Sequence, residues 1–384
     1  RLQMIHIIFI TIAFTNDTMY PSMSSLSRAV LARSRVFVVV FASRRQSSTR
    51  VMPTDAAPTC VAYDDTRTAC IIGTATGELV FRDRASSSSS HAPSIDTSGT
   101  SPRSKSQSHV STAPWTRETS TRATDGDVGI IDVALCDAEC GRRVAACAEN
   151  GEISFWDVET RARDALVALV AGRVDGGARA RQIAFAPRCG SLLLAAACDD
   201  GVVRFYEPRE RCSGTAWEAS DAFESARPGG RATALAWRRA NESGQWPLLA
   251  VGMSWPRDGR HTVCVLARDA RARRWRVVAE TEHDADADAE TKRLAWSATT
   301  TTRGAINLVA ARGSTCVVYE CTGLTTSGVG SMKTIGRLRH PGVVMSCDWN
   351  ASGSVVATTC EDGVVRLWSA NLKDGTWCEH AVAE

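Results

Sequence analysis

Two clusters in this sequence carry the residue types that hold metal ions. The stretch 284–288 alternates aspartate with alanine, as a calcium loop does, but it lacks the glycine needed at the sixth position and has Ala295 at the twelfth, where a bidentate acid is required. Cys136 and Cys140 have no matching second pair or histidine, and no C-x-x-C occurs in the chain. We therefore expect no bound metal.

Phosphate and acyl-transfer chemistry is equally unsupported. Gly323 and Gly328 have the glycine spacing of a P-loop, but Val329 and Gly330 follow where a lysine and a serine or threonine must contact phosphate. No nucleophile elbow, zinc-protease motif or cysteine–histidine pair with a third orienting residue stands out. The sequence predicts neither an enzyme nor a protein with a cofactor or small-molecule substrate.

Strand and turn signals dominate the C-terminal region instead. Residues 340–350, 354–360 and 364–368 form three short runs rich in valine, threonine and tryptophan. Gly353 and Gly363, each after a serine or aspartate, tolerate the positive φ of a tight reversal between strands. This alternation of runs and turns predicts an antiparallel meander.

The spacing of His340, Trp349, Asp362-Gly363 and Trp368 is that of one blade of a WD-repeat propeller. In such blades a histidine at this point often hydrogen-bonds the turn aspartate and a strand tryptophan, so we expect His340 to bond Asp362 and Trp368 in a structural role. One four-stranded sheet cannot bury both of its faces alone. The rest of the chain must therefore contain the neighbouring blades.

Similar units recur along the chain, with turns about 50 residues apart. A second blade is expected around Trp156 and Asp157, and the third turns at Asp200-Gly201. The strands expected in the first five blades lie at 60–63, 69–73, 78–81, 129–133, 143–147, 152–157, 182–187, 192–197, 202–207, 232–237, 248–252, 262–266, 275–279, 293–296, 306–311 and 315–319. Alanine dilutes the β propensity at 195–197, but two-residue alternation and flanking turns favour a strand there. The large aromatic residues before the turns are expected to fill the core between blades, and they are Phe185, Trp237, Trp296 and Trp349.

Composition limits the classes of partner and compartment. The chain has 384 residues, a net charge of +3 and 44% hydrophobic residues, which allows a large core and gives no global reason to bind nucleic acid or an anionic membrane. Four of the fourteen cysteines, Cys70, Cys147, Cys198 and Cys360, come directly before a turn at the end of an apolar run and are expected to behave as small hydrophobes. Dispersed cysteines fit a reducing compartment, the cytosol or the nucleus.

Two segments lie outside the repeat pattern. Residues 1–51 begin with arginine rather than methionine and include a stretch, 23–50, rich in serine and arginine with no acid. They resemble a mitochondrial transit peptide, or they are untranslated sequence read through, with Met52 as the start. We favour the second reading, because the propeller of residues 52–384 has no evident organellar role. Residues 85–125 hold five consecutive serines and are expected to be a disordered insertion, with Trp115 marking the resumption of the first blade.

Within the WD-repeat proteins, the last blade resembles that of the Sec-thirteen-homologue (Seh) family of nucleoporins. The residues that carry the resemblance there are Trp349-Asn350, Gly353, Asp362-Gly363, 365–368, Ala370-Asn371 and Lys373-Asp374. The Ala-Asn-x-Lys-Asp tail separates this family from the Sec-thirteen coat proteins. Agreement elsewhere comes from 185–187, 194–195, 200–207 and 247–252. The resemblance covers roughly residues 127–384.

The resemblance implies an all-β, open propeller of about six blades that serves as a scaffold. Members of the family accept an extra blade from a helical-solenoid nucleoporin, in the Y-shaped complex of the nuclear pore, and serve in a SEA/GATOR complex that reports amino-acid supply to the TOR kinase. The implied location is the nuclear envelope, with the cytoplasm or the lysosomal or vacuolar surface as further sites. No transmembrane segment is expected, since the apolar stretch 4–14 is too short and interrupted.

Open-ring geometry also suggests where a partner binds. An unsealed ring leaves unpaired backbone groups that a partner strand can satisfy, and we expect contacts at Thr59, Val61 and Tyr63 of the first blade and at Trp377 and Cys378 of the last. Two alternatives remain open at this point. One is a vesicle-coat scaffold of the COPII type, and the other is an adaptor that recruits peptides on its top face, which a ring of arginine or aromatic residues at the channel mouth would support.

Overall fold

The computed structural model describes most of the chain from residue 57 onward. The described residues are 57–63, 69–84, 115–124, 128–136, 142–164, 178–187, 192–211, 214–238, 247–269, 272–281, 289–301, 304–325, 328–371 and 374–383. The leader of residues 1–51, the serine run and the acidic stretch 284–288 lie outside them. No helix long and apolar enough to cross a membrane occurs within these ranges.

Every named element is a β-strand, and consecutive strands pair antiparallel into six small sheets. The first sheet contains β1 (Pro58–Tyr63), β2 (Ala69–Thr74), β3 (Glu78–Arg84) and β4 (Trp115–Arg122). The second contains β5 (Ile130–Leu135), β6 (Arg143–Ala148) and β7 (Ile153–Asp157). The third contains β8 (Ala180–Phe185), β9 (Leu194–Cys198), β10 (Val202–Arg211) and β11 (Gly214–Glu224).

The last three sheets each have four strands in sequence order. The fourth contains β12 (Arg231–Arg238), β13 (Leu248–Trp255), β14 (Arg260–Arg268) and β15 (Trp275–Glu280). The fifth contains β16 (Thr291–Thr300), β17 (Ile306–Arg312), β18 (Thr315–Thr322) and β19 (Ser331–Arg339). The sixth contains β20 (Val344–Trp349), β21 (Val355–Cys360), β22 (Val365–Ala370) and β23 (Trp377–Ala383).

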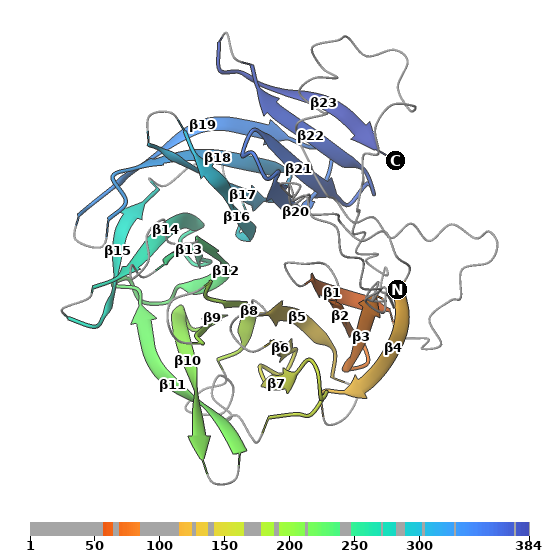
Figure 1. The fold of residues 1–384 in the computed structure, drawn as a ribbon. Helices are drawn as coiled ribbons and strands as arrows, with labels where there is room; N and C mark the ends of the chain where they lie inside the picture. The colour runs from red at the N-terminus through yellow and green to blue at the C-terminus, as the bar shows by residue number, and fades with distance from the viewer. Residues whose placement is uncertain are drawn as a thin grey trace, which may run out of the picture.

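The sheets stand around a common centre as the blades of a propeller (Figure 1). The first strand of each sheet is innermost, and these strands pack side by side in the order β1, β5, β8, β12, β16 and β20. No comparable packing joins β20 back to β1 among the described residues, and Figure 1 shows the first and last sheets separated there. The prediction of an open propeller of six blades is therefore confirmed.

Turn chemistry repeats from blade to blade. In the third sheet, Asp200 accepts a hydrogen bond from the Val202 N–H at 3.1 Å and pairs with Arg204, while Gly201 adopts φ 81°. Residues 362–366 repeat this arrangement in the sixth sheet. Each turn thus needs a carboxylate that caps the next strand and a glycine that accepts a left-handed backbone.

Small apolar side chains fill the spaces between the blades. The run Ala195–Ala197 is fully buried in β9, which confirms the strand predicted there. Cys147, Cys198 and Cys360 are buried as predicted, and burial raises the pKa of Cys198 to about 11, so its thiol stays neutral. Alanine and cysteine leave room for the inner strands to approach closely around the ring.

Three outer strands were not predicted, β11, β19 and β23, because their residues, many of them polar, give no strand pattern. The outer strand β4 begins at Trp115, as predicted, and therefore lies inside the segment assigned to the insertion. The insertion must end before this strand rather than near residue 125.

Candidate functional site: the gap between the first and last blades

The first blade presents an apolar face to the gap. Alternation along β2 and β3 sends Ile71, Leu79 and Phe81 into the core shared with the second blade. Their neighbours point the opposite way, and the described members of the resulting cluster all come from the first blade. That cluster consists of Val61, Tyr63, Cys70, Ile72 and Val80.

The last blade presents a second apolar face. Val356 and Trp368 pack against the fifth blade. The residues next to them in β21 and β22 therefore point away from the fifth blade, toward the gap. These are Val355, Ala357, Val365 and Leu367. The gap thus has two apolar walls, which is the environment that each complete blade occupies elsewhere in the ring.

Two of the predicted partner residues face a neighbouring blade rather than the gap. Thr59 points to the second blade, where its hydroxyl donates to the Ile130 carbonyl, because a bulge between Pro58 and Cys60 breaks the two-residue alternation of β1. Trp377 turns to the core shared with the fifth blade, and its ring lies 6.0 Å from that of Trp349 in its own blade.

The other three predicted residues lie where a partner could reach them. Val61 and Tyr63 belong to the gap-facing cluster of the first blade. Cys378 is exposed, adjoins Trp377 in β23 and so points the other way. Open-ring geometry predicted all five positions from their place on the first and last blades, and their role in binding a partner stays a prediction.

The structure favours packing between sheet faces over the predicted pairing at a strand edge. We expected a strand to add to an unpaired edge, yet the gap is bounded by the faces of two sheets. A partner here would bury apolar side chains on both of its faces, and its backbone would pair within its own sheet. Apolar burial contributes roughly 25 cal/mol per Å², so it would dominate this contact.

The histidine network inside the last blade differs from the prediction. His340 Nδ1 lies 3.0 Å from the Leu338 carbonyl, which makes Nδ1 the protonated nitrogen. Nε2 then accepts from the Thr358 hydroxyl at 2.7 Å, and that hydroxyl accepts from Trp368 Nε1 at 2.9 Å. The expected direct bonds to Asp362 and Trp368 were wrong, because Thr358 bridges to Trp368 and Asp362 pairs with Arg366. Sequence reasoning missed Thr358.

The second-blade signature residues are structural as well. Trp156 is buried and donates from Nε1 to Ser154 at 3.0 Å. Asp157 accepts from the backbone N–H groups of Glu159 and Thr160, which closes the turn after β7. Burial alone would raise the pKa of Asp157, but these hydrogen bonds outweigh it and lower the pKa.

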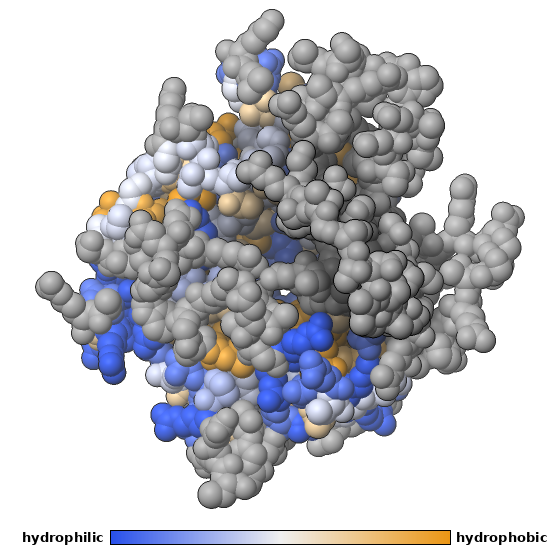
Figure 2. All heavy atoms as spheres, in the orientation of Figure 1, coloured by the Kyte–Doolittle hydropathy of each residue, from blue (hydrophilic) through white to orange (hydrophobic). Residues whose placement is uncertain are grey.

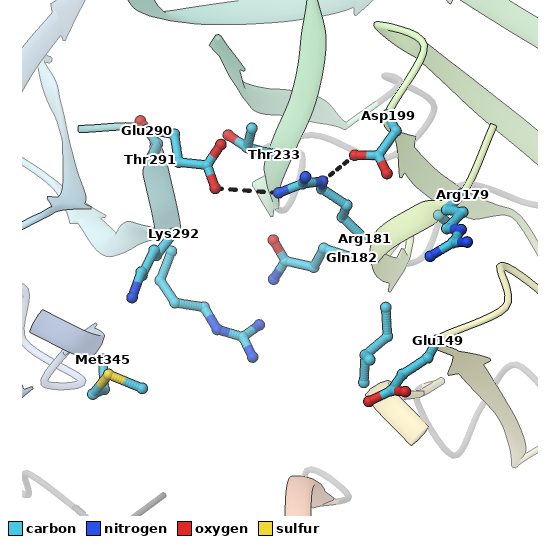
Figure 3. A pocket seen from close by; sticks show the side chains of 13 residues that line it. Glu149, Arg179, Arg181, Gln182, Asp199, Thr233, Glu290, Thr291, Lys292 and Met345 are labelled. Atoms are coloured by element: carbon cyan, nitrogen blue, oxygen red, sulfur yellow. Dashed lines mark hydrogen bonds and ion pairs between the residues drawn. The ribbon is translucent and has the colours of Figure 1, made fainter. Parts of the chain in front are cut away.

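A charged cavity of about 500 Å³ lies at the centre of the ring, among the innermost strands. Figure 3 shows Arg181 extended between Asp199 and Glu290, with a 3.2 Å bond to the latter. Four basic residues line this cavity: Arg179, Arg181, Lys292 and Arg293. Arg179 and Lys292 have no ion pair within the described ranges. Hydrophilic side chains are not confined to this cavity. Figure 2 shows that they also gather on the outer rim near β15.

One acid that is buried beside this cavity, Asp132 of the second blade, contacts the third and the fifth blades. Asp132 is buried, accepts from the Ile183 N–H at 2.9 Å, and lies 3.6 Å from Arg293. Burial raises the pKa of Asp132, and the charge of Arg293 only partly opposes this. No group of three or more metal-ligating side chains occurs in the part of the chain that the structure describes.

These features define a WD-repeat β-propeller. The family model described as "WD domain, G-beta repeat" matches residues 332–369, which span β19 and the first three strands of the last blade. Among solved structures, a chain of "Crystal Structure of Mitotic Checkpoint Complex" aligns with a TM-score of 0.53 over 83% of this chain and 76% of that one. Its sequence identity is 14%, so this likeness concerns the fold alone.

In sequence, the chain is similar to the SEH1 nucleoporins, which confirms the resemblance to the Seh family. "Protein SEH1" of Arabidopsis thaliana is 23% identical over 265 residues, 66% of this chain and 81% of the relative. "Nucleoporin SEH1" of Homo sapiens and "Nucleoporin SEH1-A" of Xenopus laevis are each 24% identical over 53% of this chain. The match spans 57% of each of these two vertebrate relatives.

Proposed function

We propose that this protein is a structural scaffold subunit of the nuclear pore, located at the nuclear envelope, that accepts one blade from a helical-solenoid nucleoporin in its gap. The single observation that carries the proposal is the pair of apolar faces bounding an unsealed ring. Similarity to the SEH1 nucleoporins supports the choice of complex. In this proposal the propeller supports nucleocytoplasmic transport, including that of mRNA, by holding the Y-shaped complex together rather than by catalysis.

The two walls of the gap have the residue types that pack against a blade. Stacked sheets pack about 10 Å apart, and both walls carry the small and branched residues that fill such joints elsewhere in the ring. A blade inserted between them would complete the circle and pack against both apolar faces. The same receptor could serve a SEA/GATOR-type complex, and that assignment depends on which solenoid protein the cell supplies.

Affinity purification of the tagged full chain, with mass spectrometry, tests the proposal. The expected result is co-purification of a solenoid nucleoporin and of other Y-complex subunits. Val61→Glu places a charge on the gap wall and should abolish co-purification, whereas Val277→Glu, at a position 38% exposed on β15, should not. Recovery of vesicle-coat subunits, with location at endoplasmic reticulum exit sites, would favour the coat alternative.

A second candidate function is supported by the central cavity. A ring of arginine or aromatic residues at the channel mouth was the feature expected of a peptide-recruiting adaptor. Among the basic residues of the cavity, Arg179 and Lys292 carry charge that no described acid neutralises by an ion pair. An acidic peptide entering the channel would find both cations.

Fluorescence polarisation with labelled acidic peptides tests this second function. Lys292→Glu should abolish binding, and Arg257→Glu on the exposed β13–β14 turn serves as the matched control. Equal binding by both variants, or none by the unmodified protein up to millimolar peptide, would rule this function out.

A further inference from the structure

The innermost strand of every blade contains a β-bulge near its start. There the strand places two residues opposite one residue of its neighbour, as β16 does between Thr291 and Arg293. The other five innermost strands shift register in the same way. A bulge adds one residue and re-aims its side chain. Five of the six added residues line the central cavity, and they are Ile131, Arg181, Thr233, Lys292 and Met345.

Three of these five side chains already have partners in the fold. Ile131 packs against the core between the second and third blades, and Arg181 is held between two carboxylates. The Thr233 hydroxyl donates to a backbone carbonyl of its own blade at 3.2 Å. Lys292 and Met345 remain. Lys292 is exposed and has no ion pair within the described ranges, and Met345 is half-buried.

The charge of Lys292 is the one that the cavity leaves unbalanced. Its neighbour Arg293 lies 3.6 Å from the buried Asp132, which offsets that charge. On the opposite side of the cavity, Figure 3 shows Arg179 and Glu149 together, so a cation and an anion oppose each other there. A carboxylate that enters the cavity is therefore drawn to Lys292 and away from the side that carries Glu149.

An apolar contact lies beside this cation. Figure 3 shows Lys292 and Met345 on the same side of the cavity. An ammonium group offers three hydrogen-bond donors and no acceptor, so it suits a carboxylate. The flexible thioether of methionine adapts to apolar groups of different shape. This side of the cavity thus combines one cationic and one apolar contact.

We propose that the central cavity recognises a peptide carboxylate that stands next to a large apolar side chain. The carboxylate binds Nζ of Lys292, and the apolar side chain packs on Met345. This inference rests on the second candidate function above and names the sequence class of its peptide. An internal acidic residue beside a large apolar residue supplies this chemistry, and so does a C-terminal apolar residue with its free carboxylate.

Fluorescence polarisation with defined peptide pools tests the sequence class on the unmodified full chain. Each pool holds labelled hexapeptides with a fixed glutamate, one varied neighbour, and mixed residues elsewhere. Pools with leucine, methionine or phenylalanine as the neighbour should bind at least about fivefold more tightly than pools with serine or glycine, since the contact removes apolar surface from water. A second set ends at an apolar residue with a free or an amidated carboxyl group, and preference for the free group assigns the terminal source.

Paired changes in the protein and the peptide test the two contacts. Replacing the peptide glutamate by glutamine should weaken binding to the unmodified protein about tenfold, but binding to Lys292→Met less than about twofold. Arg179→Met and Arg257→Met should keep the tenfold effect. Met345→Gln should remove the preference for an apolar neighbour, and Val329→Gln, at a position 83% exposed in the loop before β19, should keep it. Thermal unfolding of each variant shows whether the propeller is intact.

The outcomes separate this inference from the function on which it rests. Equal binding of all glutamate pools, whatever the neighbour, overturns the inference and leaves the recruitment of acidic peptides standing. Loss of the glutamate effect in Arg179→Met instead of Lys292→Met also overturns the inference alone. Absence of binding by every pool up to millimolar peptide overturns both.

Discussion

The hydroxyl of Thr358 lies 2.7 Å from Nε2 of His340 and joins a strand to the loop that precedes the same blade. The hydroxyl also accepts from the buried Trp368 indole. Thr358→Val keeps the shape of the side chain but leaves a ring nitrogen and an indole N–H unpaired, so the free energy of unfolding should fall by about 2 kcal/mol. Urea unfolding measures this loss.

Thr359→Val is the matched control for this change. The Thr359 hydroxyl oxygen is buried with no hydrogen-bond partner, so its removal should be neutral or slightly stabilising. Equal destabilisation by the two variants would show that the hydrogen bonds of the Thr358 hydroxyl contribute nothing to the free energy of unfolding.

Acid should weaken the last blade through the same histidine. Burial, with the charge of Arg366 acting in the same direction, lowers the pKa of His340 below its usual 6.5. The unfolded chain therefore takes up the proton first, and the free energy of unfolding should fall as the pH drops from about 7 through 6.5 to the folded pKa, then level off. His340→Gln should lose this part of the pH dependence.

Urea titrations at several pH values between 8 and 5, on both proteins, give the comparison. The stability difference between the original protein and His340→Gln should shrink as the pH falls. A difference that stays constant or grows toward pH 5 would contradict the assigned neutral imidazole.

Gly336→Ala should loosen the outer strand of the last blade. A Cβ at residue 336 would lie 2.3 Å from the Trp377 ring, so the ring must move away from Trp349. Overpacking of this kind costs about 1–3 kcal/mol. Thermal unfolding and tryptophan fluorescence would report the loss.

A double variant shows whether the collision is the cause. Adding Trp377→Val to Gly336→Ala should give less than the sum of the two separate losses, because the second change removes the clash that the first creates. Strict additivity of the two losses would mean that Gly336→Ala destabilises the fold through the backbone conformation at residue 336 and not through a clash with the Trp377 ring.

The pattern of strands and turns was enough to predict the propeller and much less of the site. Alternation and Asp-Gly turns located the inner three strands of each blade, since those strands are buried and therefore apolar. The outer strands β11, β19 and β23 lie at the rim of the ring, and their residues, many of them polar, carry no such signal. Thr59 was misplaced because a bulge reverses the side-chain direction, and a bulge of this kind leaves no mark in the sequence.

Loss of a single indole donor should weaken one joint between blades and leave the ring intact. Trp296→Phe keeps most of the buried ring but removes the 3.0 Å bond to the Ala236 carbonyl, at a cost of about 1 kcal/mol. Trp349→Phe should cost about the same at the next joint. The two bonds meet in the fifth blade, because Ala295, which accepts from Trp349, directly precedes Trp296. The free-energy loss of the double variant in urea unfolding should therefore exceed the sum of the two single losses by at least about 0.5 kcal/mol. Strict additivity would contradict this coupling and would mean that each indole bond stabilises only its own pair of blades.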